Sequence, residues 1–467
     1  MIRLRGPSLL LVWAVLGTLT AAPASAREVW QWGSASLELG GSIRELATYG
    51  GATDGERFRE TAAGAGEDCV LASRFADCPA FEGLGDRDVF QSLTRLRIEA
   101  DLTITPELSA RVVYDNEWLA GGLDTFEGSG ADSDFDTFLG LEDEIHLFGL
   151  KDQRDHFRWS HRAYRAYIRY DGEQVAATIG RQRIGWGVGR LWSPMDRFSE
   201  IPPLALEGDQ FPGVDAIEAR WQFSGFTYLQ AVYAPGTRNE EAKYAIRAHG
   251  VARDVDYSVV AGVFDRALSF GFDLATNVGD AAARLEVVYT DPHEDAWDLS
   301  DASPSPPDPF WQILVSVDYN FDLGTGLYVL VEHLYNGNAL GYGEGLAGNR
   351  LPRFEATAVP PSPAAAALGG PYVRPVGTAR FAGSRVVTLA THQTGFQVGY
   401  DLTSALRLDL VTLWDWPGSS GAYFPQVTWS GWNSAELSFG VQVFSGGKES
   451  QYGNREPLVF VLAEWWF

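Results

Sequence analysis

The chain has 467 residues, of which 45% are hydrophobic and 13% are aromatic, and it contains 51 glycines and 16 tryptophans. This composition excludes a disordered chain, and after the N-terminal region no stretch has the ~18 consecutive apolar residues that a membrane-spanning helix requires. The formal net charge is −25, which makes the chain a poor binder of nucleic acid.

A secretory signal peptide is predicted for residues 1–26. Two arginines lie among the first five residues, residues 9–19 form an apolar segment too short to span a bilayer comfortably, and residues 24–26 (Ala-Ser-Ala) form a cleavage site. An N-terminal membrane anchor is the alternative. Cleavage leaves one domain of 441 residues (467 minus 26), residues 27–467, with 34 basic residues against 61 acidic ones and a net charge of −27.

The chain contains two cysteines, Cys69 and Cys78, in a stretch rich in glycine and aspartate. After export they meet an oxidising compartment, so a disulfide that closes this short loop is predicted. Free or metal-binding thiols are the alternative, although no histidine lies beside them at metal-ligand spacing. The acidic segment 132–144 could hold Ca²⁺, but it lacks the glycine and glutamate spacing of a calcium loop, so we expect a solvated acidic loop.

Segments of about ten residues with alternating apolar and polar side chains recur along the whole chain. Between residues 93 and 104, apolar side chains occupy the even positions from Leu96 to Ile104, and the odd positions carry charged residues or threonine. Because alternate residues of a strand face opposite sides, each segment has one apolar and one wet face. Charged residues this dense in mid-strand indicate a water-filled lumen. The same alternation occurs at residues 107–115, 254–264, 311–321, 406–414 and 435–443.

Short and long connections alternate between these segments. Tight, hairpin-type turns are predicted at residues 105–107, 171–173, 224–225, 252–254, 277–280, 320–326, 401–404 and 432–434. The other connections are residues 49–88, 119–157, 184–212, 235–239, 265–266, 291–310, 337–384, 415–421 and 446–456. Short periplasmic turns that alternate with longer external loops are typical of an outer-membrane barrel. We count about 18 strands, or 16 if short segments are miscounted, and an even number puts both termini in the periplasm.

The last strand adds a further indication. From Val459 every second residue is apolar, and the chain ends on Phe467. This ending resembles the terminal strand signature of bacterial outer-membrane barrels, which the barrel-insertion machinery reads. The predicted fold is therefore all-β, a single transmembrane antiparallel up-and-down barrel in a Gram-negative outer membrane. A secreted β-sandwich or propeller is the alternative, but no repeat of propeller period occurs. Aromatic girdles are expected from Trp118, Tyr170, Trp221, Tyr319, Trp414 and Trp429.

The candidate functional site is a cluster of arginines in and around residues 158–220. A barrel this wide leaves room for an aqueous channel, and the Pro-rich connection 184–212 is of a kind that folds inward and narrows a pore. Strand parity puts Arg165 and Arg169 in the lumen, opposite Tyr164, Ala166, Ile168 and Tyr170. The expected constriction and substrate-contacting residues are Arg111, Arg165, Arg169, Arg181, Arg183, Arg190, Arg197 and Arg220.

Guanidinium groups bind carboxylates and phosphates through paired donors, and rings of charged side chains select ions in pores. The cluster therefore predicts selection of anions or binding of an acidic sugar polymer. The competing interpretation is that these arginines only stabilise the wall by pairing with lumen acids. The acids considered are Glu99, Asp101, Glu117 and Glu218.

Two short segments, Gly-Arg-Gln-Arg-Ile-Gly-Trp-Gly at 180–187 and Gly-Val-Asp-Ala at 213–216, are similar to a motif of porin-like barrels, including the alginate-export type. In that motif a Gly-Arg-Gln element ends a strand before a loop, and a Gly-x-Asp element starts the next strand. The motif covers only about forty residues, whereas the architecture covers the whole mature chain. The resemblance implies a pore for a small solute or an exported polysaccharide.

The expected function is an outer-membrane channel for small anionic solutes or an acidic polysaccharide, in contact with outer-membrane lipid and lipopolysaccharide. No cofactor and no enzymatic activity are expected, since neither a Gly-x-Ser-x-Gly elbow nor a His-Glu-x-x-His helix occurs. One alternative is a plugged barrel whose external loops bind surface polysaccharide. Another is a structural sheath around a partner protein. The sequence does not determine the solute, the direction of transport or the oligomeric state.

Overall fold

The computed structural model of the chain describes residues 27–51, 88–121, 151–154, 157–199, 203, 205–211, 213–235, 242–264, 267–292, 309–339, 353–357, 372–376, 388, 390–447, 450–453 and 457–467. The predicted signal peptide, the predicted Cys69–Cys78 disulfide and the acidic segment 132–144 lie outside the described residues. No described part of the chain forms a helix that could cross a membrane.

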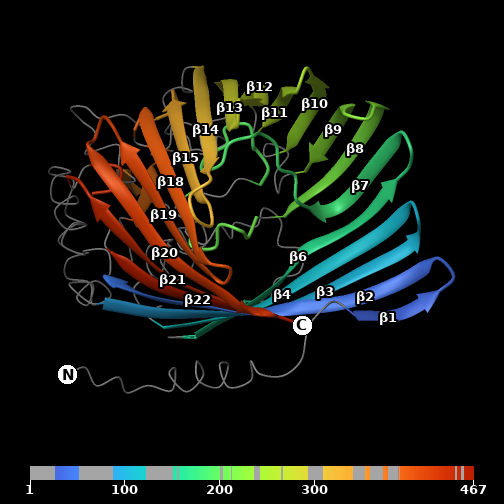
Figure 1. The fold of residues 1–467 in the computed structure, drawn as a ribbon, viewed down its shortest axis with the longest axis horizontal. Coiled ribbons are helices and arrows are strands. Elements are labelled where there is room, and N and C mark those ends of the chain that lie inside the picture. Colours follow the sequence, from blue (N-terminus) through green and yellow to red (C-terminus); the bar gives the residue numbers. More distant parts are fainter. Residues whose placement is uncertain are drawn as a thin grey trace.

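Eighteen antiparallel strands form one closed barrel (Figure 1). The strands are β2 (Ala35–Gly51), β3 (Asp88–Thr105), β4 (Leu108–Gly121), β6 (Phe157–Asp171), β7 (Val175–Gln182), β8 (Val214–Ser224), β9 (Thr227–Ala234), β10 (Lys243–Ala252), β11 (Val255–Phe264), β12 (Ala267–Val278), β13 (Ala281–Pro292), β14 (Phe310–Phe321), β15 (Leu327–Asn336), β18 (His392–Thr403), β19 (Leu406–Asp415), β20 (Ser420–Trp432), β21 (Ala435–Ser445) and β22 (Leu458–Trp466). The prediction of about 18 strands in an up-and-down barrel is confirmed.

Four further strands lie outside this ring. β1 (Arg27–Trp32) pairs with the first residues of β2, and β5 (Lys151–Arg154) pairs with β6. β16 (Arg353–Thr357) and β17 (Tyr372–Val376) pair with each other in a separate two-stranded sheet. The barrel itself does not depend on any of the four for its closure.

The barrel closes between its first and last strands. Residues 42–50 of β2 pair antiparallel with residues 458–466 of β22. At the end of the chain the backbone N–H of Gly41 donates to the carbonyl of Phe467 at 3.0 Å, and the N–H of Phe467 donates back at 2.9 Å. A lipid bilayer offers no water to unpaired backbone groups, so a sheet can span it only when such a seam removes both edges.

The two faces of the wall differ as the alternation predicts. On β11, the side chain of Val259 is 52% exposed on the outer face, whereas its neighbours Ser258 and Val260 are buried on the inner face. Tyr170 and Trp221, two of the predicted girdle aromatics, are also exposed. The short connections lie at the predicted positions; for example, Gly225 and Phe226 alone join β8 to β9.

One predicted face was wrong. Tyr164 was expected on the outer face of β6, but it lines a cavity inside the barrel together with Arg165. The register of β4 against β6 shifts at this point, since Val113 pairs with Arg165 and the next residue, Tyr114, pairs with Ala163. Tyr164 is therefore the extra residue of a β-bulge, which places two consecutive side chains on the same face.

We predict that Gly41→Ala weakens the seam. A Cβ atom at Gly41 would lie 2.3 Å from the carbonyl oxygen of Arg97 and 2.8 Å from the ring of Phe467. Such overpacking costs about 1–3 kcal/mol, measurable by urea unfolding in lipid vesicles followed by tryptophan fluorescence. Gly225→Ala is the control, because a Cβ there meets nothing within 4 Å. Equal unfolding midpoints for the two variants would contradict the prediction.

Candidate functional site

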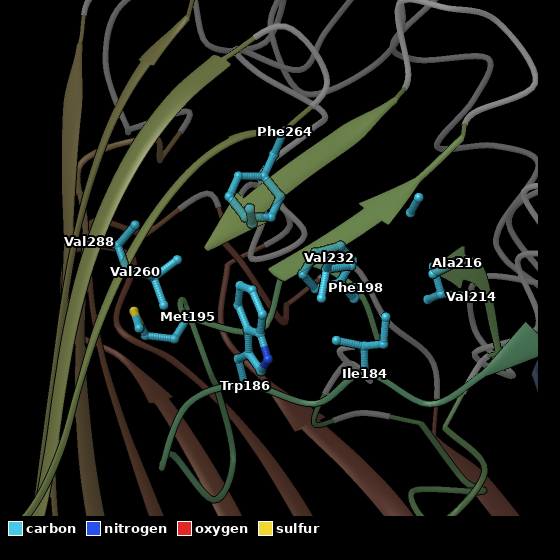
Figure 2. Packing of buried hydrophobic residues seen from close by; sticks show 12 residues of the cluster. Ile184, Trp186, Met195, Phe198, Val214, Ala216, Val232, Val260, Phe264 and Val288 are labelled. Carbon is cyan, nitrogen blue, oxygen red and sulfur yellow. The ribbon is translucent and has the colours of Figure 1, made fainter. Parts of the chain in front are cut away.

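The described residues of the connection between β7 and β8, which are 183–199, 203, 205–211 and 213, fold into the barrel (Figure 1). Its outgoing limb, residues 183–199, buries Ile184, Trp186, Met195 and Phe198 against the inner wall (Figure 2). The Trp186 and Phe198 rings pack edge to face with centroids 5.0 Å apart. The wall side of the cluster consists of Val214, Ala216, Val232, Ala234, Ala245, Val260, Phe264 and Val288. The limb therefore covers an apolar patch on the inner wall of β8–β13.

The tip of the loop reaches the wall opposite its origin, where the first contact is with Glu286 of β13. The N–H groups of Val188 and Gly189 donate to Oε1 of Glu286 at 2.5 and 2.7 Å. The N–H of Met195 donates to Oε2 at 3.0 Å, and the hydroxyl of Ser193 donates to Oε1 at 3.1 Å. One wall carboxylate thus holds both ends of a tight turn in the loop.

A second wall carboxylate, Glu332 of β15, holds the residues between these points. The N–H groups of Leu191 and Trp192 donate to Oε1 at 2.9 and 2.8 Å, and the N–H of Arg190 donates to Oε2 at 2.9 Å. Farther along the loop, the guanidinium of Arg197 donates to Oγ1 of Thr290 at 2.7 Å. The loop therefore crosses the lumen and is fixed to β13 and β15.

Two glycines of the wall provide the space for the loop tip. A Cβ atom at Gly271 of β12 would lie 2.2 Å from the sulfur of Met195, and one at Gly395 of β18 would lie 2.2 Å from a methyl group of Leu191. Any larger side chain on the lumen face at these positions would collide with the loop. The contact surface of the loop therefore extends over the inner wall from β12 to β18.

The return limb, residues 205–211, crosses back to β2 and β3. Glu207 accepts hydrogen bonds from both terminal nitrogens of Arg95 at 2.8 and 2.9 Å, and from Arg44 at 3.2 Å. Arg44 also binds Asp209 at 2.5 and 2.8 Å. Although partial burial opposes ionisation of Asp209, the hydrogen bond and charge of Arg44 hold its pKa below the usual value. Both limbs are therefore held by charged groups of the wall.

The residues of the porin-like motif form the base of the loop. Gly180 has a φ of +121°, and a Cβ atom there would lie 2.2 Å from the carbonyl oxygen of Ala166. The next residue, Arg181, makes a two-pronged ion pair with Asp215 at 3.1 and 2.7 Å. The Gln182 amide donates to the carbonyl of Ala216 at 3.2 Å. These contacts tie the end of β7 to the start of β8 at the point where the loop leaves the wall.

The outgoing limb and the wall beside it enclose a cavity of about 600 Å³. Its lining combines arginines with aromatic and amide side chains, and only two acidic residues contribute. The lining consists of Arg97, Glu99, Arg111, Val113, Tyr164, Arg165, Tyr167, Arg169, Thr178, Gln182, Arg183, Ile184, Gly185, Trp186, Glu218, Arg220, Tyr228, Gln230 and Arg247. Seven arginines against two glutamates make the cavity strongly positive.

Three of the cavity arginines have a carboxylate partner. Arg111 binds Glu99 at 2.6 Å, which is one of the acid pairings considered from the sequence. Arg97 binds Asp115 at 2.7 Å, and Arg169 binds Asp171 at 2.8 Å. The other four form no ion pair with any carboxylate of the described residues; they are Arg165, Arg183, Arg220 and Arg247. The wall therefore carries both a stabilising ladder and a set of unpaired charges.

The unpaired arginines are held by neutral groups. Arg165 donates to the backbone carbonyls of Tyr164 and Phe211, each at 2.7 Å. The guanidinium of Arg183 stacks on the Phe211 ring at 3.4 Å, and Arg247 donates to the Ser258 hydroxyl at 2.7 Å. Aromatic faces and carbonyl oxygens orient a guanidinium while leaving its charge uncompensated.

The Tyr164 ring that the bulge turns inward lies between two of the cations. The Arg97 guanidinium is 3.9 Å and the Arg165 guanidinium 4.1 Å from its centroid. A ring face carries negative electrostatic potential and attracts cations. The ring therefore reduces the repulsion between two arginines that face the same cavity.

The eight arginines expected at the constriction separate into three groups. Arg111, Arg165, Arg169, Arg183 and Arg220 line the cavity, whereas Arg181 and Arg197 are buried in structural contacts away from it. Arg190 lies at the loop tip and contacts Glu332 through its backbone N–H. Sequence reasoning did not select Arg97, Arg247, Tyr164 or the two wall glutamates. Of these residues, only Arg97 could have been placed in the lumen from the sequence, because it lies in the clearly alternating segment 93–104.

The sequence matches no protein-family model and no curated protein. The structure is similar to that of OccAB2 from Acinetobacter baumannii, with 8% identity, a TM-score of 0.50 and coverage of 92% of this chain and 98% of that one. A BenF-like porin from Pseudomonas fluorescens Pf-5 is similar at 10% identity, a TM-score of 0.50 and the same coverage. At such identities the likeness concerns the fold, which is that of a porin-like barrel of the Gram-negative outer membrane.

We predict that Arg181 contributes to stability, in contrast to Arg169, which also pairs with an aspartate but at an exposed position. The side chains of Arg181 and Asp215 are 7% and 17% exposed, against 43% and 48% for Arg169 and Asp171. Breaking a buried pair costs about 3 kcal/mol or more, and breaking an exposed one less than about 1 kcal/mol. Urea unfolding of Arg181→Met and Arg169→Met in vesicles measures the difference. A larger loss of unfolding free energy in Arg169→Met than in Arg181→Met would contradict the prediction.

Proposed function

We propose that the protein is an outer-membrane channel that prefers small anionic solutes, with carboxylates as the best-fitting class. The observation that carries the proposal is the set of four cavity arginines without a carboxylate partner, Arg165, Arg183, Arg220 and Arg247. A guanidinium offers a carboxylate two parallel donors. An unpaired one inside a narrowed lumen is available for this, whereas one already paired with a wall acid is not.

The arginines lie at different depths along the wall, which suits passage better than tight binding. Arg165 lies on β6 six residues before Asp171, and Arg220 of β8 is level with Asp171 through their common neighbour Ala176 of β7. At about 3.3 Å per residue, Arg165 and Arg220 are about 20 Å apart along the strand direction. A solute can then exchange one guanidinium for the next, and several moderate sites allow release where one strong site would retain the solute.

The size of the cavity supports a small solute over an acidic polysaccharide. Its volume of about 600 Å³ falls within the ~300–1,000 Å³ typical of sites for single small molecules. The β7–β8 loop crosses the lumen beside it, and this inward loop also argues against a sheath that encloses a partner protein. The tyrosine and tryptophan side chains of the lining suit the apolar part of an organic anion.

We expect the purified, refolded protein to conduct ions in a planar bilayer and to prefer chloride and acetate over potassium in a salt gradient. Arg183→Gln and Arg220→Gln should each lower the ratio of anion to cation permeability about sevenfold. The interaction between unit charges about 7 Å apart in water is ~0.6 kcal/mol, and it enters the ratio twice because the guanidinium attracts the anion and repels the cation. The reversal potential in the gradient reports the ratio.

Arg407→Gln is the matched control. Arg407 lies on β19, is paired with Asp401 and Asp409 at 3.1 and 2.8 Å, and does not line the cavity. Its replacement should leave the reversal potential nearly unchanged. A wild-type channel that prefers cations, or an equal effect of all three variants, would refute the proposal. A silent bilayer with correctly folded protein would favour the plugged, surface-binding barrel.

A further inference from the structure

We propose that Glu286 and Glu332 form a two-point latch that holds the β7–β8 loop across the lumen and thereby sets the largest solute that the channel admits. The inference rests on the proposed channel function. The latch consists of these two carboxylates, and the latched segment is residues 187–195 of the loop.

Both latch carboxylates are buried without a cation. Their residues are 0% exposed, and no lysine, arginine or histidine among the described residues forms an ion pair with either. Burying a carboxylate in this way is costly unless hydrogen bonds replace its water. The backbone N–H groups of the latched segment are those donors, six in total, and they are supplemented by the Ser193 hydroxyl. The wall carboxylates are thus stabilised by the loop.

The dependence is mutual. Five successive N–H groups of the latched segment, those of residues 188–192, and the N–H of Met195 point at the wall, and without the carboxylates they would be buried donors with no acceptor. Gly187 has a φ of +95°, and a Cβ atom there would lie 2.6 Å from Oε1 of Glu286. A positive φ beside residues of ordinary conformation turns consecutive N–H groups toward one anion. The local backbone is therefore shaped to receive a carboxylate.

The latch is connected directly to the cavity. Residues Arg183 to Trp186 form one side of the cavity, and the latched segment begins at the next residue. The segment has no strand neighbour of its own, so the position of the cavity wall depends on where the segment is fixed. Release of the segment would let this side of the cavity move away from the arginines on β3–β10 and would widen the passage.

The rest of the contact surface is complementary but less directional. Gly271 and Gly395 provide room for Met195 and Leu191 without determining how far the loop extends. The cluster around Trp186 and Phe198 holds the start of the limb through apolar packing. If this packing alone positioned the loop, removal of the latch charges would leave the passage unchanged, and this difference can be tested.

The test measures the size limit of the channel by exclusion of polyethylene glycols of graded size from the conducting pore, which does not depend on charge. The variants are Glu286→Gln, Glu332→Gln and the double variant. Glutamine keeps the shape but replaces one acceptor oxygen with an NH₂ group that opposes the N–H donors. We expect the exclusion limit to rise in each, and the double variant to conduct about twofold more, since barrels of this size without an inward chain leave an open channel.

Two further variants separate the latch from loss of charge. Asp273→Asn removes a carboxylate from a residue of the inner wall that is only 2% exposed and makes no hydrogen bond to the described part of the loop, so its exclusion limit should equal that of the wild type. Glu332→Asp keeps the charge but withdraws it by one methylene group, so it should widen the pore. If Glu332→Asp had the exclusion limit of the wild type while Glu332→Gln had a larger one, the charge alone would explain the effect, and the latch would be overturned.

The remaining outcomes also decide the question. An unchanged exclusion limit in the double variant would overturn the proposal. So would glutamine variants that fail to form a heat-modifiable barrel while Asp273→Asn folds, because the carboxylates would then serve the barrel and not the loop. If the wild type shows no anion preference but the latch variants widen the pore, the latch stands and the proposed selectivity fails.

Discussion

The requirement that every backbone N–H and C=O group in a bilayer find a partner within the protein governs this structure. This requirement can be met only by a closed sheet, because an open sheet has unpaired edges. The closure pairs β2 with β22, whose residues are more than four hundred positions apart. Closure by eighteen strands in turn fixes the width. A ring of this size leaves an interior that side chains from the wall cannot fill, so a narrow passage needs a segment of chain within it.

The β7–β8 loop meets this need, and its attachment follows from what a lumen wall can offer. Inside the barrel the wall is polar, so the loop is held mainly by charge and hydrogen bonds, with one apolar cluster near its origin. The two limbs use opposite chemistry. Carboxylates of the wall receive N–H groups of the outgoing limb, whereas arginines of the wall, Arg44 and Arg95, receive the carboxylate of Glu207 on the return limb. The cavity beside the outgoing limb lies against β3–β10, which carry three of the four unpaired arginines.

Much of the fold was predictable from the sequence, because lipid on one side and water on the other impose an alternation that is readable residue by residue. Residues 93–104 and 254–264 lie in the structure as that alternation requires, and the short turns lie where glycine, proline and aspartate indicate them. Inward folding of residues 184–212 was expected as well. These predictions use only local information, and local information is sufficient for strands and turns.

The site was less predictable, because its properties depend on contacts between distant residues. Nothing near Arg181 distinguishes it from Arg183, yet cross-strand register gives Arg181 an aspartate partner and leaves Arg183 in the cavity. Glu286 and Glu332 look like any lumen acid in the sequence, and only the path of a loop about 100 and 140 residues earlier in the chain gives them a role. A bulge likewise shifts the parity of an alternating strand by one residue, so that parity counted back from Arg165 placed Tyr164 on the wrong face.

The bulge at Tyr164 also bears on how such a pore could diversify. Before the bulge the even-numbered residues of β6 face the lumen, as the contact of Arg162 with Glu117 indicates, and after it the odd-numbered residues do. Loss of the Tyr164 codon would restore a regular strand and leave every other residue of β6 on its present face, because Ala163 and Arg165 already face opposite sides of the wall. A change in chain length by one residue would therefore remove one aromatic side chain from between two lumen arginines in one evolutionary step, without altering the charge of the wall.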